Sequence, residues 1–223
     1  MRVICFDTET TGLPEKRNTS IYETSKWPHV VQLSFMVYDD EKKEIVEEYD
    51  EIIKIDESIH LTPKSVEIHG ISRDIIHERG VPIIDALNAF KRALNSCDLC
   101  VGHNISFDKR LLIVEAIRNK GFDSTDKSYV QFQFKNEFCT MLKSVEVCRI
   151  EKLRGDGTVY FKYPTLLELH KHLFKKIPNN AHNSKVDVLI CLRCYCKLAH
   201  NQDLSCENRQ FRRMYREHCA IKI

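Results

Sequence analysis

The sequence predicts an α/β fold with a mixed five-stranded sheet that begins as an antiparallel meander and is flanked by helices. Runs rich in β-branched and aromatic residues fill the N-terminal part, and helical patterns alternate with short apolar runs after it. The 223 residues are 43% hydrophobic and 30% charged, a composition that suits a soluble globular protein.

The first part of the chain is expected to form the meander. Three runs of β-forming residues are predicted strands, near 2–6, 30–38 and 45–53. The polar residues 39–43 predict a hairpin connection between the second and third strands. The long polar loop 13–28 contains Trp27, which either stacks on a base or packs the loop against the body.

The rest of the chain is expected to alternate helices with short strands. Apolar spacing predicts helices near 82–96, 104–119, 140–150, 164–174 and 182–199. Pro82 suits the first turn of a helix, where no amide hydrogen is needed. Short strands near 98–101 and 137–139 complete the sheet. We expect one domain over 1–200, with a basic helical extension over 201–223 packed on it.

The charge and the cysteine content limit the possible classes of protein. The ten cysteines predict reduced thiols, because the chain is not small and shows no secretory signal. No run approaches the length of a membrane span. We therefore expect an intracellular protein of the cytoplasm or nucleus that is not secreted and binds no membrane. With a net charge of +2, any nucleic-acid surface must come from local basic patches.

Cys191 and Cys194 have the spacing of half a zinc site. The residues around them, 186–192, are mostly apolar and predict a buried helix, whereas compact zinc pairs usually lie on turns. We prefer to interpret both cysteines as small core residues, and the zinc site stays an alternative.

Asp7 and Glu9 follow the apolar run 3–6. Because successive side chains of a strand point to opposite faces, both carboxylates share one face and Thr8 points to the other. Ligands of open α/β sheets bind beyond the carboxyl ends of the strands. The pair is therefore either a metal site or a chance pair of exposed acids.

Two later segments supply further candidates. Asn104 is a candidate helix N-cap, and Asp108, about one turn inside that helix, can face the end of the first strand. His182 and Asp187 lie near the start of the last long helix. An imidazole there could abstract a proton from water near neutral pH, and Asp187 could bind a metal beside it. Taken singly, Asp108 is better explained as an exposed acid on a helix surface, and His182 as a surface or capping residue.

Together, the segments resemble the three motifs of the DnaQ-like 3′–5′ exonucleases of the DEDDh type. The matching residues are Phe6-Asp7-Thr8-Glu9-Thr10-Thr11-Gly12, His103-Asn104-Ile105-Ser106-Phe107-Asp108 and His182-Asn183-Ser184-Lys185-Val186-Asp187. Ile68-His69-Gly70-Ile71-Ser72 and the segments 138–142 and 163–169 also match, so the resemblance spans residues 4–187. Lys185 and Val188 depart from the usual pattern, but neither is an acidic or histidine position of the motifs.

The resemblance implies an RNase H-like fold and hydrolysis of nucleic acid from its 3′ end, with release of nucleoside 5′-monophosphates. It implies that Asp7, Glu9, Asp108 and Asp187 bind two divalent cations, Mg²⁺ with Mn²⁺ as a substitute, and that His182 is the general base. Two such ions about 3.5–4 Å apart would clamp the attacking water and the leaving oxygen. Hard oxygen ligands favour these metals.

The resemblance further implies single-stranded 3′ ends of DNA or RNA as the substrate, and it is compatible with a polymerase or a replication or repair complex as a partner. The expected substrate-binding residues are Thr8, Thr10, Thr11, Gly12, Leu13, His69, His103, Asn104 and Phe107. Basic residues form a candidate strand track: Lys171, Lys175 and Lys176, then Arg209, Arg212, Arg213 and Arg216 with Phe211 and Tyr215. A solvated amphipathic C-terminal helix explains the second group slightly better.

Two other functions fit part of the sequence. A haloacid-dehalogenase-like phosphatase also has an apolar strand followed by two acids, but Glu9 is wrong for that motif and His182 would have no role. A catalytically silent nucleic-acid-binding module on the same fold is the other alternative. The presence of all five acidic and histidine positions counts against it.

Overall fold

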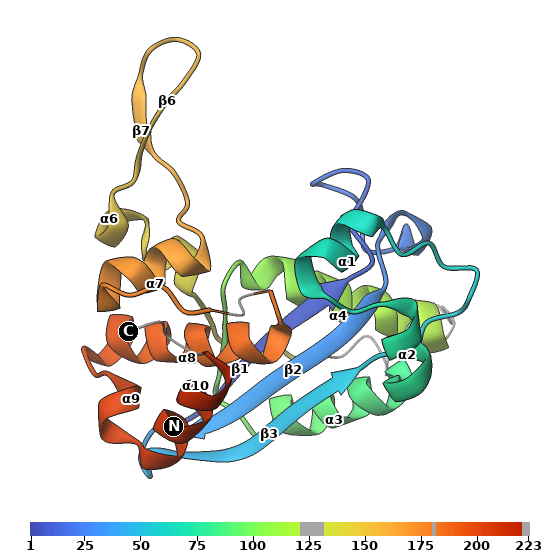
Figure 1. Cartoon of the computed structure of the whole chain (residues 1–223), viewed down its shortest axis with the longest axis horizontal. Helices are drawn as coiled ribbons and strands as arrows, with labels where there is room; N and C mark the ends of the chain where they lie inside the picture. Colours follow the sequence, from blue (N-terminus) through green and yellow to red (C-terminus); the bar gives the residue numbers. More distant parts are fainter. Residues whose placement is uncertain (121–131, 180–181, 220–223) are drawn as a thin grey trace.

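The computed structural model describes residues 1–120, 132–179 and 182–219. Its centre is a five-stranded sheet with the strand order β3-β2-β1-β4-β5 (Figure 1). The strands are β1 (Arg2–Thr10), β2 (Val30–Asp39), β3 (Glu44–Ile52), β4 (Leu99–Gly102) and β5 (Glu137–Cys139). The first three are antiparallel neighbours, and β4 and β5 run parallel to β1. The predicted mixed sheet with an initial meander is confirmed.

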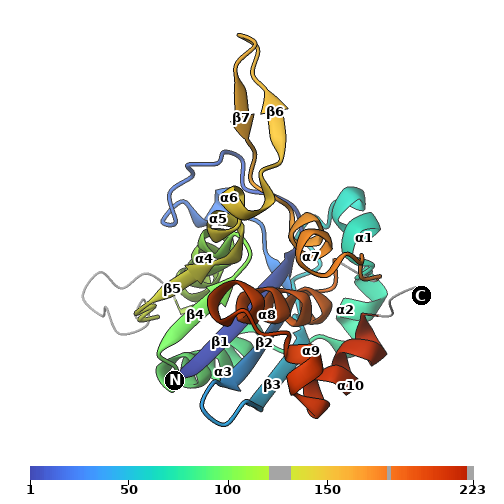
Figure 2. The same cartoon turned by 90° about the vertical axis from the view of Figure 1, so that its left-hand side faces the viewer.

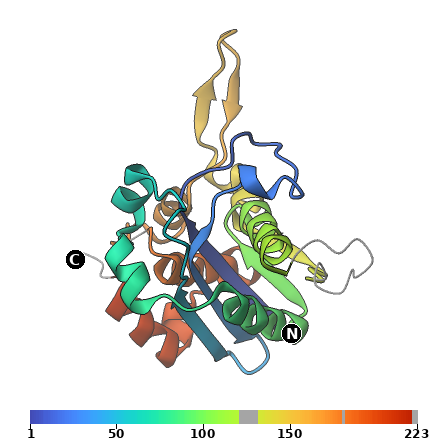
Figure 3. The ribbon, with the colours of Figure 1, turned by 90° about the vertical axis from the view of Figure 1, so that its right-hand side faces the viewer.

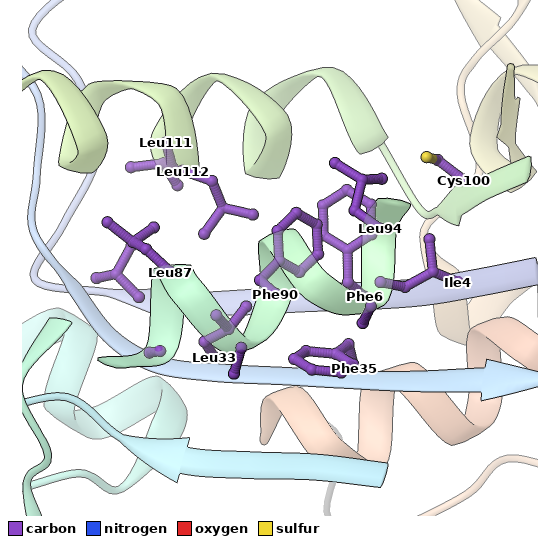
Figure 4. Packing of buried hydrophobic residues seen from close by; sticks show 14 of the residues in the cluster. Ile4, Phe6, Leu33, Phe35, Leu87, Phe90, Leu94, Cys100, Leu111 and Leu112 are labelled. Atoms are coloured by element: carbon purple, nitrogen blue, oxygen red, sulfur yellow. The ribbon is translucent and has the colours of Figure 1, made fainter. Parts of the chain in front are cut away.

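Two hydrophobic clusters cover the two faces of the sheet. Ile4 and Phe6 pack with α3 (Ile83–Asn95) and α4 (Ile105–Lys120), whereas Val3 and Cys5 of the opposite face pack with α8 (Ser184–His200). Figure 4 shows the first cluster, where the ring of Phe90 meets Phe6 edge to face at 4.9 Å. In Figure 2, α8 lies across β1 and β2, and Figure 3 shows α3 and α4 from the other side. Because both faces of β1 are covered, its sequence is a continuous apolar run.

Shorter elements surround this core. They are α1 (Pro63–His69), α2 (Arg73–Arg79), α5 (Thr140–Lys143), α6 (Val145–Cys148), α7 (Leu166–Phe174), α9 (Leu204–Glu207), α10 (Arg209–His218) and the 3-10 turn η1 (Thr24–Lys26). A separate hairpin of β6 (Glu151–Leu153) and β7 (Val159–Phe161) projects from the body in all three ribbon views. Within the described part of the chain, no helix is both long and apolar enough to cross a membrane.

Several element boundaries differ from expectation. β1 continues to Thr10, so Asp7 and Glu9 lie inside the strand rather than after it. The helix expected at 140–150 is divided into α5 and α6 at Ser144, whose φ of −105° and ψ of 2° leave the helical range. Pro82 precedes α3 as its N-cap, with ψ of 134°, instead of occupying the first turn. The helices α1 and α2 and the β6–β7 hairpin were not expected.

The cysteines and Trp27 belong to the interior. Cys191 and Cys194 are buried in the α8 cluster, and all ten cysteines are free thiols, which agrees with their interpretation as core residues. Trp27 is 4% exposed and donates a 2.9 Å hydrogen bond to the carbonyl of Ser20. The guanidinium of Arg110 lies 4.6 Å from its ring centre. Trp27 therefore packs the loop against the body and is not free to stack on a base.

A buried ion pair fastens the same loop to α4 and β2. Glu115 is 2% exposed and accepts hydrogen bonds from the amide of Val30 at 3.0 Å and from Arg118 at 2.7 Å. Arg118 also donates to the carbonyls of Thr24 at 2.6 Å and Trp27 at 3.0 Å. The Glu115–Arg118 pair thus joins the helix, the strand and the loop.

Replacement of Arg118 by alanine should destabilise the fold strongly, because it leaves the Glu115 carboxylate buried without its cation. We expect a loss of about 3 kcal/mol in the free energy of unfolding, measured by urea titration. Lys64→Ala is the control, since Lys64 pairs with Glu67 on the surface and should matter little. Similar losses in the two variants would contradict the role given to this pair.

Candidate active site

Carboxylates gather at the end of β1. Asp7 and Glu9 come from one face of the strand, and Asp187 comes from the first turn of α8. One oxygen of each lies within 4.8 Å of the others. Asp108 stands beside them on α4, where one of its oxygens accepts hydrogen bonds from the amide of Thr8 at 3.1 Å and from its hydroxyl at 2.7 Å. The structure therefore brings the four predicted acids together, three in one cluster and the fourth adjacent to it.

The alternation of β1 explains this arrangement. Thr8 points away from Asp7 and Glu9, as expected, and its buried hydroxyl meets α4 on the opposite face of the sheet. Asp108 is 4% exposed. Its carboxylate is held by Thr8, the strand residue between Asp7 and Glu9. The sequence Asp7-Thr8-Glu9 consequently positions three carboxylates, two of its own and one from α4.

A polar network that the sequence analysis missed positions α8. The hydroxyl of Ser184 donates to the carbonyl of Asp7 at 2.9 Å, and its amide donates to the side chain of Gln32 at 3.2 Å. Gln32 in turn donates to Asp50 at 2.8 Å. Gln32 lies opposite Glu9 in the β1–β2 register, so it stands beside the acids on the same face. The sequence contained one indication of this role: Gln32 is a polar residue, two positions before Ser34, in a strand that is otherwise mostly apolar.

Burial and mutual repulsion raise the pKa values of the acids in the metal-free protein. The pKa of Asp7 lies well above its ordinary value because of desolvation, followed by repulsion from Asp108 and Asp187. Desolvation and the same two neighbours raise the pKa of Glu9 to about 8. Desolvation also raises the pKa values of Asp108 and Asp187 to about 7.

The cluster has the properties that a divalent cation requires. Its donors are carboxylate oxygens, which suit hard cations such as Mg²⁺ or Mn²⁺. The ionised acids are costly without a counter-charge, as their raised pKa values indicate. No lysine or arginine is ion-paired to Asp7, Glu9 or Asp187 within the described ranges; Lys185, the neighbouring cation, pairs with Glu48 at 2.5 Å. The residues therefore fit a metal centre.

His182 lies just outside α8 instead of on it, because the helix begins at Ser184 with Asn183 as its N-cap. Its backbone adopts a left-handed φ of 72°, and its amide donates to the carboxylate of Asp187 at 3.2 Å. The imidazole is exposed. The carboxylate thus fixes the main chain of His182 while the side chain remains accessible to solvent.

The expected nucleotide-binding segment after Glu9 makes a compact turn. The hydroxyl of Thr10 donates to the carbonyl of Gly12 at 2.6 Å, and the hydroxyl of Thr11 accepts from the amide of His29 at 3.0 Å. Both threonines are buried, whereas Leu13 is 81% exposed. His69 accepts from the amide of Ile71 at 3.0 Å, and its other ring nitrogen lies 3.3 Å from the carbonyl of Thr10. One ring nitrogen of His69 thus contacts this turn, and the other caps the chain at Ile71.

His103 is similarly enclosed by protein. Its Nε2 lies 3.0 Å from the carbonyl of Pro164, and its Nδ1 lies 2.9 Å from the hydroxyl of Thr140. Because a carbonyl can only accept, Nε2 carries the proton of the neutral ring and Nδ1 accepts from Thr140. Burial supports this neutral form by lowering the pKa of His103 to about 4. Both ring nitrogens of His103 are therefore bonded to other parts of the protein, at Thr140 and Pro164.

Asn104 and Phe107 border an open groove of about 450 Å³. Asn104 directly precedes α4, with a left-handed φ of 64° in place of the extended backbone usual for an N-cap. Lys143 and Tyr163 line the same groove. Tyr163 begins the segment 163–169 that matches the family, whereas no sequence motif marks Lys143, the last residue of α5.

Comparisons with known proteins identify the family and the fold of this chain. The RNase T family model, described as an exonuclease family, matches residues 4–195. The chain belongs to the RNase T exonuclease family. This is the DEDDh, or DnaQ-like, family of 3′–5′ exonucleases, so the resemblance inferred from the motifs is confirmed and the phosphatase alternative is excluded. A comparison with curated proteins finds no match.

Solved structures share the fold of this exonuclease-family chain. Exonuclease I of E. coli in complex with a dA16 oligonucleotide has a TM-score of 0.61 at 18% identity, over 96% of this chain and 43% of that one. Exonuclease I of Methylocaldum szegediense has a TM-score of 0.61 at 17% identity, over 97% of this chain and 45% of that one. The present chain thus spans less than half the length of these proteins.

Neutralisation of Glu9 should stabilise the metal-free protein at alkaline pH. A carboxyl whose pKa rises from 4.5 in the unfolded chain to about 8 in the folded one lowers stability as the pH rises through that window. We therefore expect Glu9→Gln to raise the melting temperature in EDTA at pH 8 and to have little effect at pH 4. Excess Mg²⁺ should remove the gain.

Thermal unfolding at both pH values, with EDTA and with Mg²⁺, measures this effect. Glu67→Gln is the matched control, because Glu67 is exposed on α1. A gain that is equal at both pH values, or that persists in Mg²⁺, would contradict the electrostatic explanation.

Proposed function

We propose that the chain is a metal-dependent 3′–5′ exonuclease that acts on single-stranded ends of DNA or RNA and releases nucleoside 5′-monophosphates. The observation that carries this proposal is the cluster of Asp7, Glu9 and Asp187, whose oxygens lie within 4.8 Å of one another with Asp108 alongside. Such an activity would serve a polymerase or a replication or repair complex.

Asp7, Glu9, Asp108 and Asp187 would hold two divalent cations, with Mg²⁺ preferred and Mn²⁺ as a substitute. When bound, the ions supply charge stabilisation for the attacking and leaving oxygens of an in-line displacement. The protein contributes the alignment of the acids. Thr8 orients Asp108, and Ser184 ties α8, and with it Asp187, to β1.

His182 is the proposed general base, which would take the proton of the attacking water at an imidazole nitrogen. Its exposed side chain can reach a substrate at the cluster, and the hydrogen bond from its amide to Asp187 holds its main chain at a metal-binding residue. The other ordered histidines near the motifs, His69 and His103, are unsuited to this role because protein groups occupy their ring nitrogens.

The groove at the start of α4, the helix that also carries Asp108, is the proposed seat of the substrate's 3′ end. Asn104 and Phe107 border it, and Arg17 and Lys143 supply positive charge at its rim. The turn of residues 10–13 would flank the terminal nucleotide. Exonuclease I of E. coli, which shares the fold, has been solved with dT13 and dA16 oligonucleotides, and we extend a single-stranded substrate to this chain.

Digestion of end-labelled oligonucleotides tests the function directly. Single- and double-stranded DNA and RNA are incubated with Mg²⁺, Mn²⁺ or EDTA, and the products are separated by size. We expect stepwise shortening from the 3′ end that EDTA abolishes. Release from the 5′ end, internal cleavage or metal-independent cleavage would contradict the proposal, and binding without any cleavage would favour the silent-module alternative.

Replacement of Asp7 by asparagine should abolish hydrolysis and preserve the fold, because the side chain keeps its size and loses the charge that binds metal. Activity on the labelled oligonucleotides and the circular dichroism spectrum measure the two effects. Asp74→Asn, at an exposed acid of α2, is the matched control and should be fully active. Full activity of Asp7→Asn would refute the assignment.

His182→Ala should lower kcat by about 100-fold or more near neutral pH, the usual contribution of a general base. Binding of metal and of single-stranded substrate should be largely retained, since the carboxylates are untouched. Single-turnover kinetics and substrate binding in EDTA separate these effects. His77→Ala, at an exposed histidine of α2, is the control. An unchanged kcat would exclude His182 as the base.

A further inference from the structure

A second, strongly basic cavity of about 960 Å³ lies among α7, α8, α9 and α10. None of its lining residues belongs to the carboxylate cluster or to the groove at the start of α4. One lining residue is acidic, Asp203, and six are cationic: Lys175, Lys176, Arg193, Lys197, Arg212 and Arg216. The cavity is therefore a concentration of positive charge on a protein whose net charge is only +2.

The cavity unites basic segments that are distant in the sequence. Lys175 and Lys176 follow α7, and Arg212 and Arg216 are four residues apart on α10. The apolar side of α10, including Phe211 and Tyr215, packs on α8 and is 0% and 3% exposed. The burial of these two rings excludes stacking on bases and agrees with the amphipathic helix preferred for this segment. Their burial instead fixes α10 so that two arginines line the cavity.

A buried network makes one wall of the cavity rigid. Arg193 donates two hydrogen bonds to Asp203, at 2.8 and 2.7 Å. Its guanidinium lies 3.9 Å from the ring centre of Phe174 and 4.8 Å from that of Tyr215. The hydroxyl of Tyr215 lies 2.7 Å from a ring nitrogen of His170. The charge of Arg193 is thus neutralised by Asp203, and this arginine has a structural role in the wall of the cavity.

The other five cations have no carboxylate partner among the described residues. Lys175 donates to the carbonyl of His172 at 2.8 Å, and Lys197 donates to the side chain of Asn201 at 2.8 Å. Arg212 donates to the carbonyls of Ser205 and Cys206. Neutral acceptors such as these orient the cations but leave their charge uncompensated. An anion in the cavity would lower this repulsion.

The cavity is joined to the active site by α8. Asp187 of the carboxylate cluster, Arg193 and Lys197 all lie on this helix. At a rise of 1.5 Å per residue, Arg193 and Lys197 are about 9 and about 15 Å further along the axis than Asp187. This axial distance from the acids corresponds to the length of a few nucleotides of an extended strand.

We propose that this cavity binds backbone phosphates of the single strand, upstream of the nucleotide that is removed; the inference rests on the proposed exonuclease function. Because the guanidinium of Arg193 lies over the ring of Phe174 and Tyr215 is 3% exposed, the cavity offers charge and little aromatic surface for stacking. Recognition there is consequently independent of base sequence and sensitive to salt.

Two charge-matched double variants test the proposal. Lys176→Glu with Arg216→Glu inverts two charges of the cavity. Arg209→Glu with Arg213→Glu inverts two exposed charges of α10 that belong to the track expected from the sequence but do not line the cavity. Binding of a fluorescent single-stranded dT oligonucleotide is measured by anisotropy in EDTA at several salt concentrations. We expect the cavity variant to raise Kd at least about 10-fold and to reduce the magnitude of the salt slope by about 1.4, for two lost phosphate contacts. The control should change Kd less than about 3-fold.

Two further measurements separate this proposal from its alternatives. Both variants should hydrolyse the p-nitrophenyl ester of thymidine 5′-monophosphate like wild type, since this substrate has no strand to reach the cavity. Inorganic tripolyphosphate should compete weakly with the oligonucleotide in wild type; competition as strong as that of the oligonucleotide itself would indicate a site for free polyphosphate and overturn the proposal.

Equal oligonucleotide binding by the two variants would also overturn it and would leave an acidic protein segment as the ligand class to pursue. A wild-type protein that binds the strand in EDTA but never cleaves it would refute the exonuclease function alone. Circular dichroism and melting temperature confirm that both variants are folded.

Discussion

The structure depends on one electrostatic constraint: four carboxylates that repel one another must be held together at the end of a buried strand. Desolvation and repulsion raise their pKa values, so the metal-free cluster opposes its own ionisation. The surrounding bonds act against this tendency. Thr8 holds Asp108, and Ser184 attaches α8 to the carbonyl of Asp7. Helices pack on both faces of β1 and keep the strand in place despite the repulsion between its acids.

Local patterns predicted the parts of this arrangement that follow from strand geometry. The alternation of β1 placed Asp7 and Glu9 on one face with Thr8 on the other, and the β-branched runs located the sheet. The spacing of the three motifs identified the family, which the match over residues 4–195 confirms. Short elements escaped detection because strands of three residues, such as β6 and β7, are too brief for a periodic signal.

Tertiary contacts account for what the sequence could not reveal. In the sequence, Gln32 is a polar residue within an apolar strand. Its role in positioning α8 is visible only in the structure, where the amide of Ser184 donates to its side chain. His182 was expected on a helix, but capping by Asn183 starts that helix two residues later and leaves the histidine accessible. The basic segments after α7 and on α10 were separate patches in the sequence. Packing of α10 through Phe211 and Tyr215 unites them around one cavity.

The attachment of α8 to β1 has a consequence for the order of folding. Ser184 and Asp7 are separated by 177 residues along the chain, so their contact closes a very long loop. Contacts of this kind form late, after local helices and hairpins. During synthesis, the acids of β1 must therefore wait until α8 has been made before they acquire Asp187. The acid cluster cannot be complete until α8 has packed on β1, and a chain that ends before α8 lacks it.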